Sequence, residues 1–516
     1  MGLTAPLRRA LASVPDRVAT VCGDRVRTWA EHGDRVARLA SALLDLGVGR
    51  GDRVAMLARN SDRYVEYLSA VPWAGAVLNP VNTRWSPEEI AYSLRDSGTA
   101  VLFVDDGFAH LVPELRREVP ALTAVVHCGD GPPPADLPSY EDLVDVSRPV
   151  GDAERGGDDL AGVFYTGGTT GGAKGVMLSH RNVMTSGAGS TALGFGRPGG
   201  RFLHAAPLFH MAGFSLWLAG SLHAGTHVVL PGFDAVAVVA AVHEHRVTDA
   251  LFVPTMIGML LDRVEDSGLP LDSLRGIVYG GSPIPSAVLE HARAVLPQVG
   301  FTQAYGMTEL SPVATVLGAT DHDDPALRRS VGRAAPHVEL RVVDDTGVEV
   351  PTGVPGEVVV RGDNVMRGYW GKPRQTAAAL RRGWLHTGDV GYLDGRGYLF
   401  LVDRIKDMII SGGENVYSVE VEDVLARHPA VASCAVIGVP DPRWGERVHA
   451  VVRPVDGARV DAEELRAHCR RHIAGYKVPA GVEFVSTLPL SAAGKVLKRV
   501  LRDEYLAARA GTGRPR

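Results

Sequence analysis

Cysteine and long apolar runs are both scarce in this chain of 516 residues. The four cysteines are scattered, without the close spacing that metal sites or disulfide frameworks show. Because no secretory signal is present either, we expect a reducing, cytoplasmic location and no disulfide. The most apolar stretches, residues 214–222 and 236–242, are too short to span a bilayer, so only peripheral membrane contact stays open.

Basic tracts are also missing, and the formal net charge is −5. Nucleic-acid-binding proteins carry basic patches, so nucleic acid is not the expected partner and small molecules are. The length exceeds what one hydrophobic core usually supports, which predicts two or more domains. A monomer or a homodimer is expected.

Lysine is the scarcest charged residue, because nearly all basic positions are arginine. In such a chain a retained lysine marks a position where a compact point charge is preferred to a guanidinium fork. The chain has six: Lys174, Lys372, Lys406, Lys477, Lys495 and Lys498.

A glycine- and threonine-rich stretch, YTGGTTGGAKG at residues 165–175, stands out most. Its glycines let the backbone wrap closely around an anion, and its hydroxyls and single ammonium neutralise charge, which predicts a phosphate-binding loop. A plain turn is the alternative. A Walker A loop is excluded, because Lys174 lies between Ala173 and Gly175 and no Ser or Thr follows it.

The surrounding pattern predicts an α/β protein. Amphipathic segments alternate with short apolar runs, the rhythm of β-α-β units and a parallel sheet. A helix is expected to begin at residues 179–186, and its N-terminus would help to hold phosphate. Four later apolar runs predict a second parallel sheet: residues 202–206, 227–230, 250–253 and 276–279.

The last third of the chain changes character. Residues 335–360 are β-branched and turn-rich, which predicts a small barrel of antiparallel strands. Beyond residue 407, helices (418–427 and 462–472) alternate with strands (432–439 and 449–453), which predicts a compact α+β domain.

Five further stretches combine glycine with chemically useful side chains. Each could by itself have a purely structural role, as a turn, a structural histidine or a solvated lysine. In chain order they are YGGSPIP (279–285), QAYGMTE (303–309), HTGD (386–389), DRIKD (403–407) and SAAGK (491–495).

Taken in this order with the phosphate loop, the stretches resemble the adenylate-forming superfamily, which includes acyl-CoA synthetases, luciferases and adenylation domains. The resemblance runs from about residue 51 to 499. Two positions depart from the commonest loop, with Gly167 where serine is usual and Ala173 where proline is usual. The resemblance implies a large N-terminal domain (1–403) of two doubly wound sheets with helices and a small β-barrel. A hinge (404–407) would join it to a smaller α+β domain (408–516).

The resemblance also implies a nucleotide site. Tyr305 would lie near adenine, Asp389 would accept the ribose hydroxyls, and Arg404 would contact ribose and phosphate. Thr166 and Glu309 would help to hold Mg²⁺, which prefers oxygen ligands. The full set implied for ATP and AMP is Thr166, Gly167, Gly168, Thr169, Thr170, Lys174, Gly280, Gly281, Ser282, Tyr305, Gly306, Asp389 and Arg404.

The reaction implied is a two-step ligation, in which a carboxylic acid forms an acyl-AMP with ATP and a thiol then displaces AMP. Lys495 would bridge the substrate carboxylate and the α-phosphate, where a positioned ammonium lowers their repulsion. Thr308, Glu309 and His210 complete the catalytic set. Lys406 would act at the hinge as the small domain rotates. Coenzyme A would meet Gly412, Gly413, Trp444 and Lys477.

The acid is expected to be apolar, because no arginine or histidine is evidently placed to neutralise a second carboxylate. A medium- or long-chain fatty acid is the first expectation, and an aryl or alicyclic acid is the alternative. A separate acyl carrier protein is the alternative acceptor. A nucleotide-binding protein without catalysis is disfavoured, since Lys495 and Glu309 are both present. The residues expected to line the acyl pocket are Met211, Ala212, Gly213, Ala304, Pro312 and Val313.

Overall fold

The computed structural model describes residues 1–166, 173–404, 407–411, 414–490 and 496–511. The chain divides into two compact units, Met1–Leu340 with Val360–Leu385, and Arg341–Val359 with His386–Arg516. It passes from one unit to the other within strands β16 (Glu339–Val343), β17 (Gly356–Arg361) and β20 (Trp384–Leu393). The predicted hinge lies inside the second unit, so the division at residues 404–407 stays a prediction about motion.

A nine-stranded sheet forms one half of the first unit, in the order β15-β14-β13-β12-β11-β9-β10-β1-β2. Its central strands are parallel, which confirms the predicted second parallel sheet. The N-terminal hairpin β1–β2 at one edge was not predicted. The strands are β1 (Val18–Cys22), β2 (Arg25–Thr28), β9 (Arg201–His204), β10 (Thr226–Val229), β11 (Asp249–Phe252), β12 (Gly276–Gly280), β13 (Gly300–Gly306), β14 (Val313–Leu317) and β15 (Arg333–Ala334).

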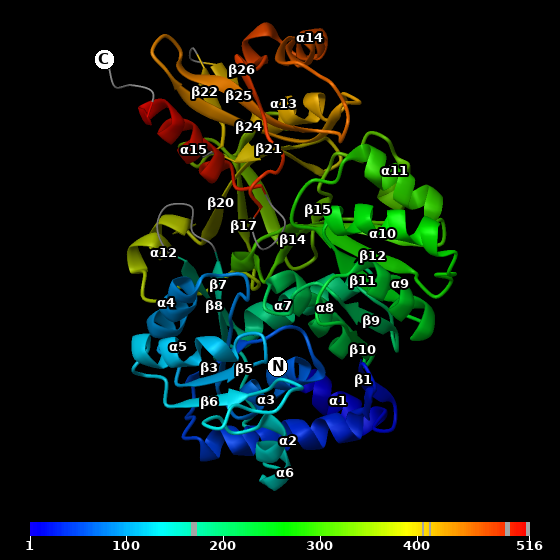
Figure 1. Ribbon diagram of the computed structural model, residues 1–516, viewed down its shortest axis with the longest axis vertical. Helices are drawn as coiled ribbons and strands as arrows, with labels where there is room; N and C mark the ends of the chain where they lie inside the picture. Colours follow the sequence, from blue (N-terminus) through cyan, green and yellow to red (C-terminus); the bar gives the residue numbers. More distant parts are fainter. Residues whose placement is uncertain (167–172, 405–406, 412–413, 491–495, 512–516) are drawn as a thin grey trace. The chain divides into compact units, whose positions relative to one another are not determined.

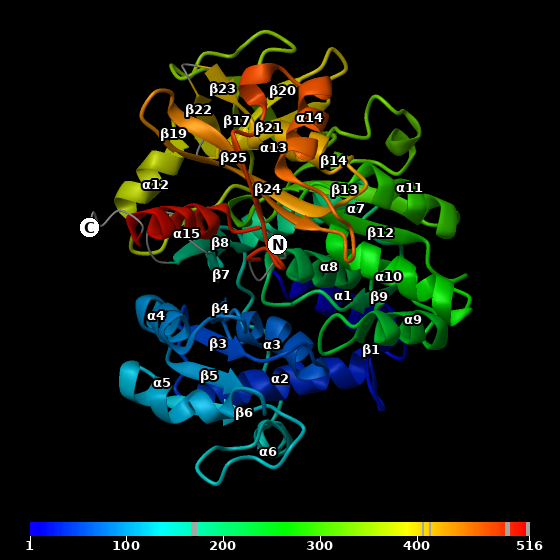
Figure 2. The same ribbon diagram turned by 45° about the horizontal axis from the view of Figure 1, so that its top comes forward.

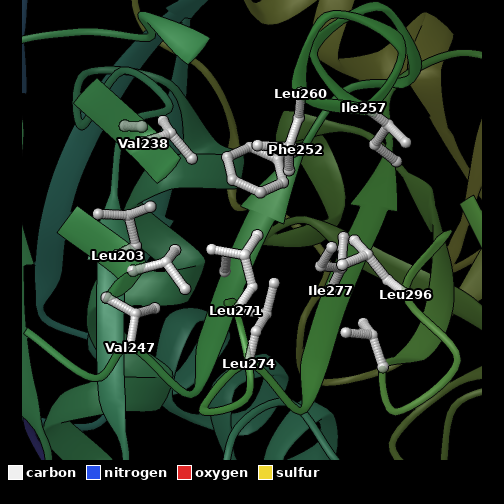
Figure 3. Packing of buried hydrophobic residues seen from close by; sticks show 14 of the residues in the cluster. Leu203, Val238, Val247, Phe252, Ile257, Leu260, Leu271, Leu274, Ile277 and Leu296 are labelled. Atoms are coloured by element: carbon white, nitrogen blue, oxygen red, sulfur yellow. The ribbon is translucent and has the colours of Figure 1, made fainter. Parts of the chain in front are cut away.

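Helices cover both faces of this sheet, as the alternation of its buried side chains requires. On one face, Leu203 and Ile277 belong to a buried cluster (Figure 3) that includes side chains of three helices. These helices, labelled in Figure 1, are α9 (Ala235–Glu244), α10 (Pro254–Ser267) and α11 (Ser286–Val295). Their chain neighbours Phe202 and Val278 point to the other face and pack with α8 (Met211–Leu222). Strands β9 and β12 therefore each contribute to two separate cores.

A seven-stranded sheet forms the other half of the first unit, in the order β18-β8-β7-β4-β3-β5-β6. Strands β3 to β7 run parallel, and β8 and β18 are antiparallel additions at one edge. The strands are β3 (Arg53–Leu57), β4 (Val77–Pro80), β5 (Val101–Val104), β6 (Ala124–His127), β7 (Leu160–Thr166), β8 (Lys174–Ser179) and β18 (Gly368–Tyr369).

The helices of this half include α4 (Pro87–Ser97) and α5 (Val112–Glu118), which lie beside the strands of this sheet in Figure 2. Their apolar side chains pack with those of β3 and β5 in one buried cluster. Helices α1 (Ala5–Ser13) and α2 (Trp29–Asp45) also belong to the first unit. The others are α3 (Asp62–Trp73), α6 (Tyr140–Val146), α7 (His180–Ala192) and α12 (Pro373–Ala379).

The second unit contains the predicted α+β domain. Its sheet has the order β23-β22-β25-β24, with β26 parallel to β25. Helices α13 and α14 pack on this sheet through Val421, Leu425 and Leu465. The elements are β22 (Ile409–Ser411), β23 (Glu414–Val416), α13 (Ser418–Leu425), β24 (Val431–Asp441), β25 (Gly445–Pro454), α14 (Ala462–His472), β26 (Gly481–Phe484) and α15 (Lys498–Gly511).

The turn-rich region forms a further antiparallel sheet in the order β16-β17-β20-β19, with β21 (Leu399–Arg404) beside β20. Strand β19 is Leu380–Arg381. In the described part of the chain, no helix has both the length and the apolar character needed to cross a membrane.

Candidate active site

The predicted phosphate loop connects two paired strands. Thr166, the last residue of β7, lies opposite Lys174, the first residue of β8, so the loop leaves and returns through an antiparallel ladder. Trp370 N–H donates to the carbonyl of Gly175 at 2.7 Å and anchors the returning strand. The predicted ligands Gly167, Gly168, Thr169 and Thr170 lie outside the described residues.

The predicted helix start at residues 179–186 is confirmed, because α7 begins at His180 with Ser179 as its N-cap. The predicted contact between its N-terminus and phosphate is not supported by the structure. Strand β8 separates the loop from α7, and six residues of strand extend by about 20 Å. The N-terminus of α7 is instead satisfied within the helix, because Ser179 and Asn182 form a capping box. Strand β8 was not predicted from the sequence, because it is defined by its pairing with β7 and not by a pattern of its own.

Five of the residues predicted to bind ATP and AMP lie at the carboxyl ends of two neighbouring parallel strands. Gly280 ends β12 and is the register partner of Ala304 in β13, which continues through Tyr305 to Gly306. Gly281 and Ser282 follow β12 directly. Ligands of open α/β sheets bind outside the carboxyl ends of such strands. The structure therefore brings these predicted residues together at one sheet edge.

Gly306 is required by a close approach. A Cβ at this position would lie 1.8 Å from the carbonyl oxygen of Pro312, which no side chain could tolerate. Met307 and Thr308 follow, partly exposed, and η2 (Thr308–Leu310) then turns the chain so that Glu309 is buried. The strand end thus presents Thr308 at the surface with a buried carboxylate beside it in the chain.

His210 lies at the N-cap of α8, in the segment that follows β9. Its Nδ1 accepts from the N–H of Ala212 at 3.3 Å, so the proton of the neutral ring sits on Nε2. Buried Asn60 fixes the start of this segment by donating to the carbonyls of His204 and Ala206. The ring of His210 is therefore held in one orientation by its own helix.

Three of the six predicted acyl-pocket residues meet at one apolar cluster. Ala212 and Ala304 are partly exposed and pack against a buried cluster that includes Val313. Met211 is buried, and Pro312 is partly exposed. Gly213 has a structural reason to be glycine, because a Cβ there would lie 2.2 Å from the carbonyl oxygen of Pro207.

A tyrosine that the sequence did not single out joins two predicted charged residues. The hydroxyl of Tyr369 donates to Glu309 Oε1 at 2.8 Å, and Lys174 Nζ lies 4.9 Å from the centre of the Tyr369 ring. Burial and the Glu309 carboxylate both raise the pKa of Tyr369 above its ordinary value, which keeps the phenol a donor. The only feature of the sequence that could have drawn attention to Tyr369 is that it follows a glycine and precedes a second aromatic residue, Trp370.

The donor set fits a magnesium ion that shares its coordination with phosphate. Among the described residues, no cluster of three or more His, Cys, Asp or Glu side chains could hold a metal by itself. Mg²⁺ is commonly bound by one or two carboxylates together with substrate phosphates and water. Glu309 and the hydroxyl of Thr166 offer oxygen ligands of this kind.

In the second unit, Asp389 of β20 is the register partner of Arg404 in β21, so the two predicted ribose contacts start from neighbouring backbone positions. The preceding turn is fixed by Glu357, which accepts from the N–H of Gly388 and lies 2.7 Å from His386 Nδ1. The side chain of Asp389 is 94% buried.

The predicted coenzyme A residues differ in their surroundings. Trp444 lies in the turn between β24 and β25, half exposed, with the Arg443 guanidinium 4.7 Å from its ring. The ammonium of Lys477 binds both carboxylate oxygens of Glu420, at 2.8 and 2.7 Å. Gly412, Gly413, Lys406 and Lys495 lie outside the described residues.

Comparison with known proteins identifies close relatives over nearly the whole chain. Residues 7–370 match the family described as AMP-binding enzyme, and residues 420–495 match its C-terminal domain. A feruloyl-CoA synthase from Amycolatopsis sp is 42% identical over 97% of this chain and 98% of its own. A fatty acid–[acyl-carrier-protein] ligase, ScoC from Streptomyces coeruleorubidus, is 37% identical over 95% and 94%.

A solved structure is similarly close in fold. The anthranilate CoA ligase AuaEII, in complex with anthranoyl-AMP, superposes with a TM-score of 0.90. It is 29% identical and covers 99% of this chain, with 98% of its own chain covered. The similarity therefore extends over both units.

Proposed function

We propose, since the chain belongs to the AMP-binding enzymes of the adenylate-forming superfamily, that it activates an aromatic carboxylic acid and transfers it to coenzyme A. Its enzyme class is acid–thiol ligase, with ATP as the energy source. The identity of the acid and the roles of individual residues are our inference.

The ligation has two steps. A carboxylate oxygen attacks the α-phosphorus of ATP. The bond between the α-phosphorus and the oxygen that bridges it to the β-phosphate breaks, and pyrophosphate leaves. The thiol sulfur then attacks the acyl carbon of the acyl-AMP, and AMP leaves. The first step brings two anions together, so its barrier depends on positioned positive charge and hydrogen-bond donors.

The residues at the sheet edge suit the first step. Thr308 donates to the α-phosphate or the substrate carboxylate, while Lys174 at the loop base holds the phosphates that leave. Mg²⁺ neutralises charge on the phosphate oxygens when bound, and Glu309 with Thr166 would hold it. Lys495 supplies the ammonium between carboxylate and α-phosphate. His210, with Nε2–H as its donor side, would lie at the mouth between acid and thiol.

The aromatic acid is favoured by one observation, the 42% identity to feruloyl-CoA synthase over almost the full length of both chains. The pocket supports it. Behind Ala212 and Ala304 lies a filled cluster that includes Val278 and Val316, so a long alkyl chain would have to displace buried side chains.

A fatty acid passed to a carrier protein is the second candidate. It is favoured by the 37% identity to the fatty acid–[acyl-carrier-protein] ligase. A fatty acid was the first expectation from the sequence, and the order is now reversed, because the relatives with higher identity are named for an aromatic acid.

A panel of acids separates the candidates. Pyrophosphate release is measured with ferulate, indoleacetate, octanoate and palmitate, each with and without coenzyme A, and the thioester is identified by mass spectrometry. We expect kcat/KM for an aromatic acid to exceed that for both fatty acids by about tenfold or more, which is the scale of discrimination that apolar pockets achieve.

Heat-inactivated protein and Glu309→Gln serve as controls for contaminating ligases. Preference for octanoate or palmitate would contradict the aromatic assignment. Acyl-AMP that accumulates with coenzyme A present, and reacts only with a carrier protein, would contradict the acceptor.

A further inference from the structure

Residues 364–370, between β17 and the end of β18, bridge two parts of the candidate site. We call them the bridging segment. On one side, β18 pairs with β8, and Arg367 N–H donates to the carbonyl of Met177 at 2.9 Å. On the other side, Met366 N–H donates to the carbonyl of Glu309 at 2.8 Å. The segment therefore connects the returning strand of the phosphate loop to the residue predicted to bind Mg²⁺.

Within this segment, Tyr369 contacts both Glu309 and Lys174. It is 92% buried, its hydroxyl donates to Glu309 Oε1, and its ring lies beneath the Lys174 ammonium. The distance of 4.9 Å is within the range in which the face of an aromatic ring attracts a cation.

These contacts have a physical consequence for the carboxylate. A buried carboxylate has few waters to hold it, so a hydrogen-bond donor decides which way it points. The hydroxyl of Tyr369 donates to Oε1 of Glu309 at 2.8 Å and so fixes that oxygen of the carboxylate. Hydrogen bonds to charged groups are the strongest of their kind in proteins.

We propose that Tyr369 is a positioning residue, which sets the Glu309 carboxylate for Mg²⁺ and the Lys174 ammonium for phosphate as one unit. This rests on the proposed function, because it assumes that the site binds Mg²⁺ with ATP. The hydroxyl contacts Glu309 and the ring contacts Lys174. Removing the hydroxyl should therefore affect the binding of Mg²⁺, and removing the ring should affect the binding of phosphate.

Tyr369→Phe tests the hydroxyl. ATP affinity is measured by calorimetry, once with Mg²⁺ and once with EDTA. The ring stays, so we expect unchanged affinity in EDTA, while the gain in affinity that Mg²⁺ confers falls about tenfold, as one hydrogen bond to a charged group is worth. Tyr369→Leu also removes the ring, so its affinity in EDTA falls as well, by about threefold.

The matched control is Tyr392→Phe, which removes the hydroxyl of a tyrosine stacked on Phe400 in the second unit. It should bind ATP like the wild type under both conditions. In a Glu309→Gln background, Tyr369→Phe should produce no further loss, because the hydroxyl acts through that carboxylate.

Three results with Tyr369→Phe as the single substitution would overturn the proposal: an unchanged gain in affinity from Mg²⁺, equal losses with Mg²⁺ and EDTA, or an unfolded protein by circular dichroism. Additive losses in the Glu309→Gln background would overturn it too. Failure of the proposed function is read separately, from the wild type. A wild type that binds Mg-ATP but activates no aromatic acid contradicts the substrate and leaves the role of Tyr369 standing.

Discussion

Individual lysines in this lysine-poor chain have different tasks. Lys477 binds Glu420, and Lys498 lies 2.8 Å from Glu422, a carboxylate whose pKa is raised by burial. These two ammonium groups stabilise the second unit through ion pairs. Scarcity of lysine therefore does not by itself mark chemistry, and the role of Lys495 needs its own test.

Lys495→Ala should separate the two steps of ligation. Without the ammonium, the carboxylate and α-phosphate repel each other, so we expect acid-dependent ATP–pyrophosphate exchange to fall by about 100-fold or more. Thioester formation from preformed acyl-AMP should stay within about threefold of wild type, because that step contains no approach of two anions.

The control is Lys372→Ala, which removes an ammonium that donates to Tyr92 Oη at 3.0 Å and lies 3.6 Å from Asp96. Both half-reactions should persist in it. Equal losses of both half-reactions in Lys495→Ala would contradict a role confined to adenylation.

At the scale of elements, the loop after β13 depends on a buried amide. Asn364 is fully buried, and its Nδ2 donates to the carbonyls of Leu310 and Val313 at 2.9 and 3.1 Å. The hydroxyl of Ser311 donates back to the carbonyl of Asn364 at 2.8 Å. These bonds fix the turn that carries Thr308 and Glu309.

Asn364→Ala should therefore destabilise the first unit. Two buried carbonyls lose their donor, so we expect the free energy of unfolding in urea to fall by about 2–4 kcal/mol. Asn82→Ala is the matched control, since it removes one turn bond to Arg84 N–H at a partly exposed position and should cost less than about 1 kcal/mol. A loss below 1 kcal/mol in Asn364→Ala would mean that the turn holds without the amide.

Elements with a strong local pattern could be predicted from the sequence. Helix α14 occupies the predicted residues 462–472, and β24 and β25 lie where strands were expected. Strands β1 and β8 were missed, because their identity depends on pairing with distant segments and not on their own periodicity. The six residues of β8, KGVMLS, show too little alternation of apolar and polar side chains to identify a strand.

The same limit applies to the candidate site. Gly306, Thr308 and Glu309 could be predicted, because their residue types and order are characteristic of a family. Tyr369 and Asn364 could not, since each acts through a hydrogen bond whose partner lies more than fifty residues away. Such contacts follow from the pairing of β18 with β8, which no local pattern encodes.

At the scale of the whole molecule, a set of buried histidines joins α2 to the nine-stranded sheet. Trp29 of α2 contacts the rings of His32 and His227 edge-on, and His227 Nδ1 lies 2.9 Å from His204 Nε2. Burial lowers the pKa of His32 and of His204 to about 3 and that of His227 well below its ordinary value. All three rings are therefore neutral in the folded protein.

This set predicts instability in mild acid. The unfolded chain binds a proton at each histidine below about pH 6.5, while the folded chain does not until about pH 3, so stability is complete above pH 6.5 and falls below it. From pH 7 to pH 5, each histidine should lower the free energy of unfolding by about 2 kcal/mol.

His227→Gln should remove one such contribution from the difference between urea titrations at the two pH values, whereas exposed His110→Gln should not. A glutamine cannot take up the proton that His227 binds when the chain unfolds. If His227→Gln keeps the full pH dependence of the wild type, the acid sensitivity therefore arises at other residues.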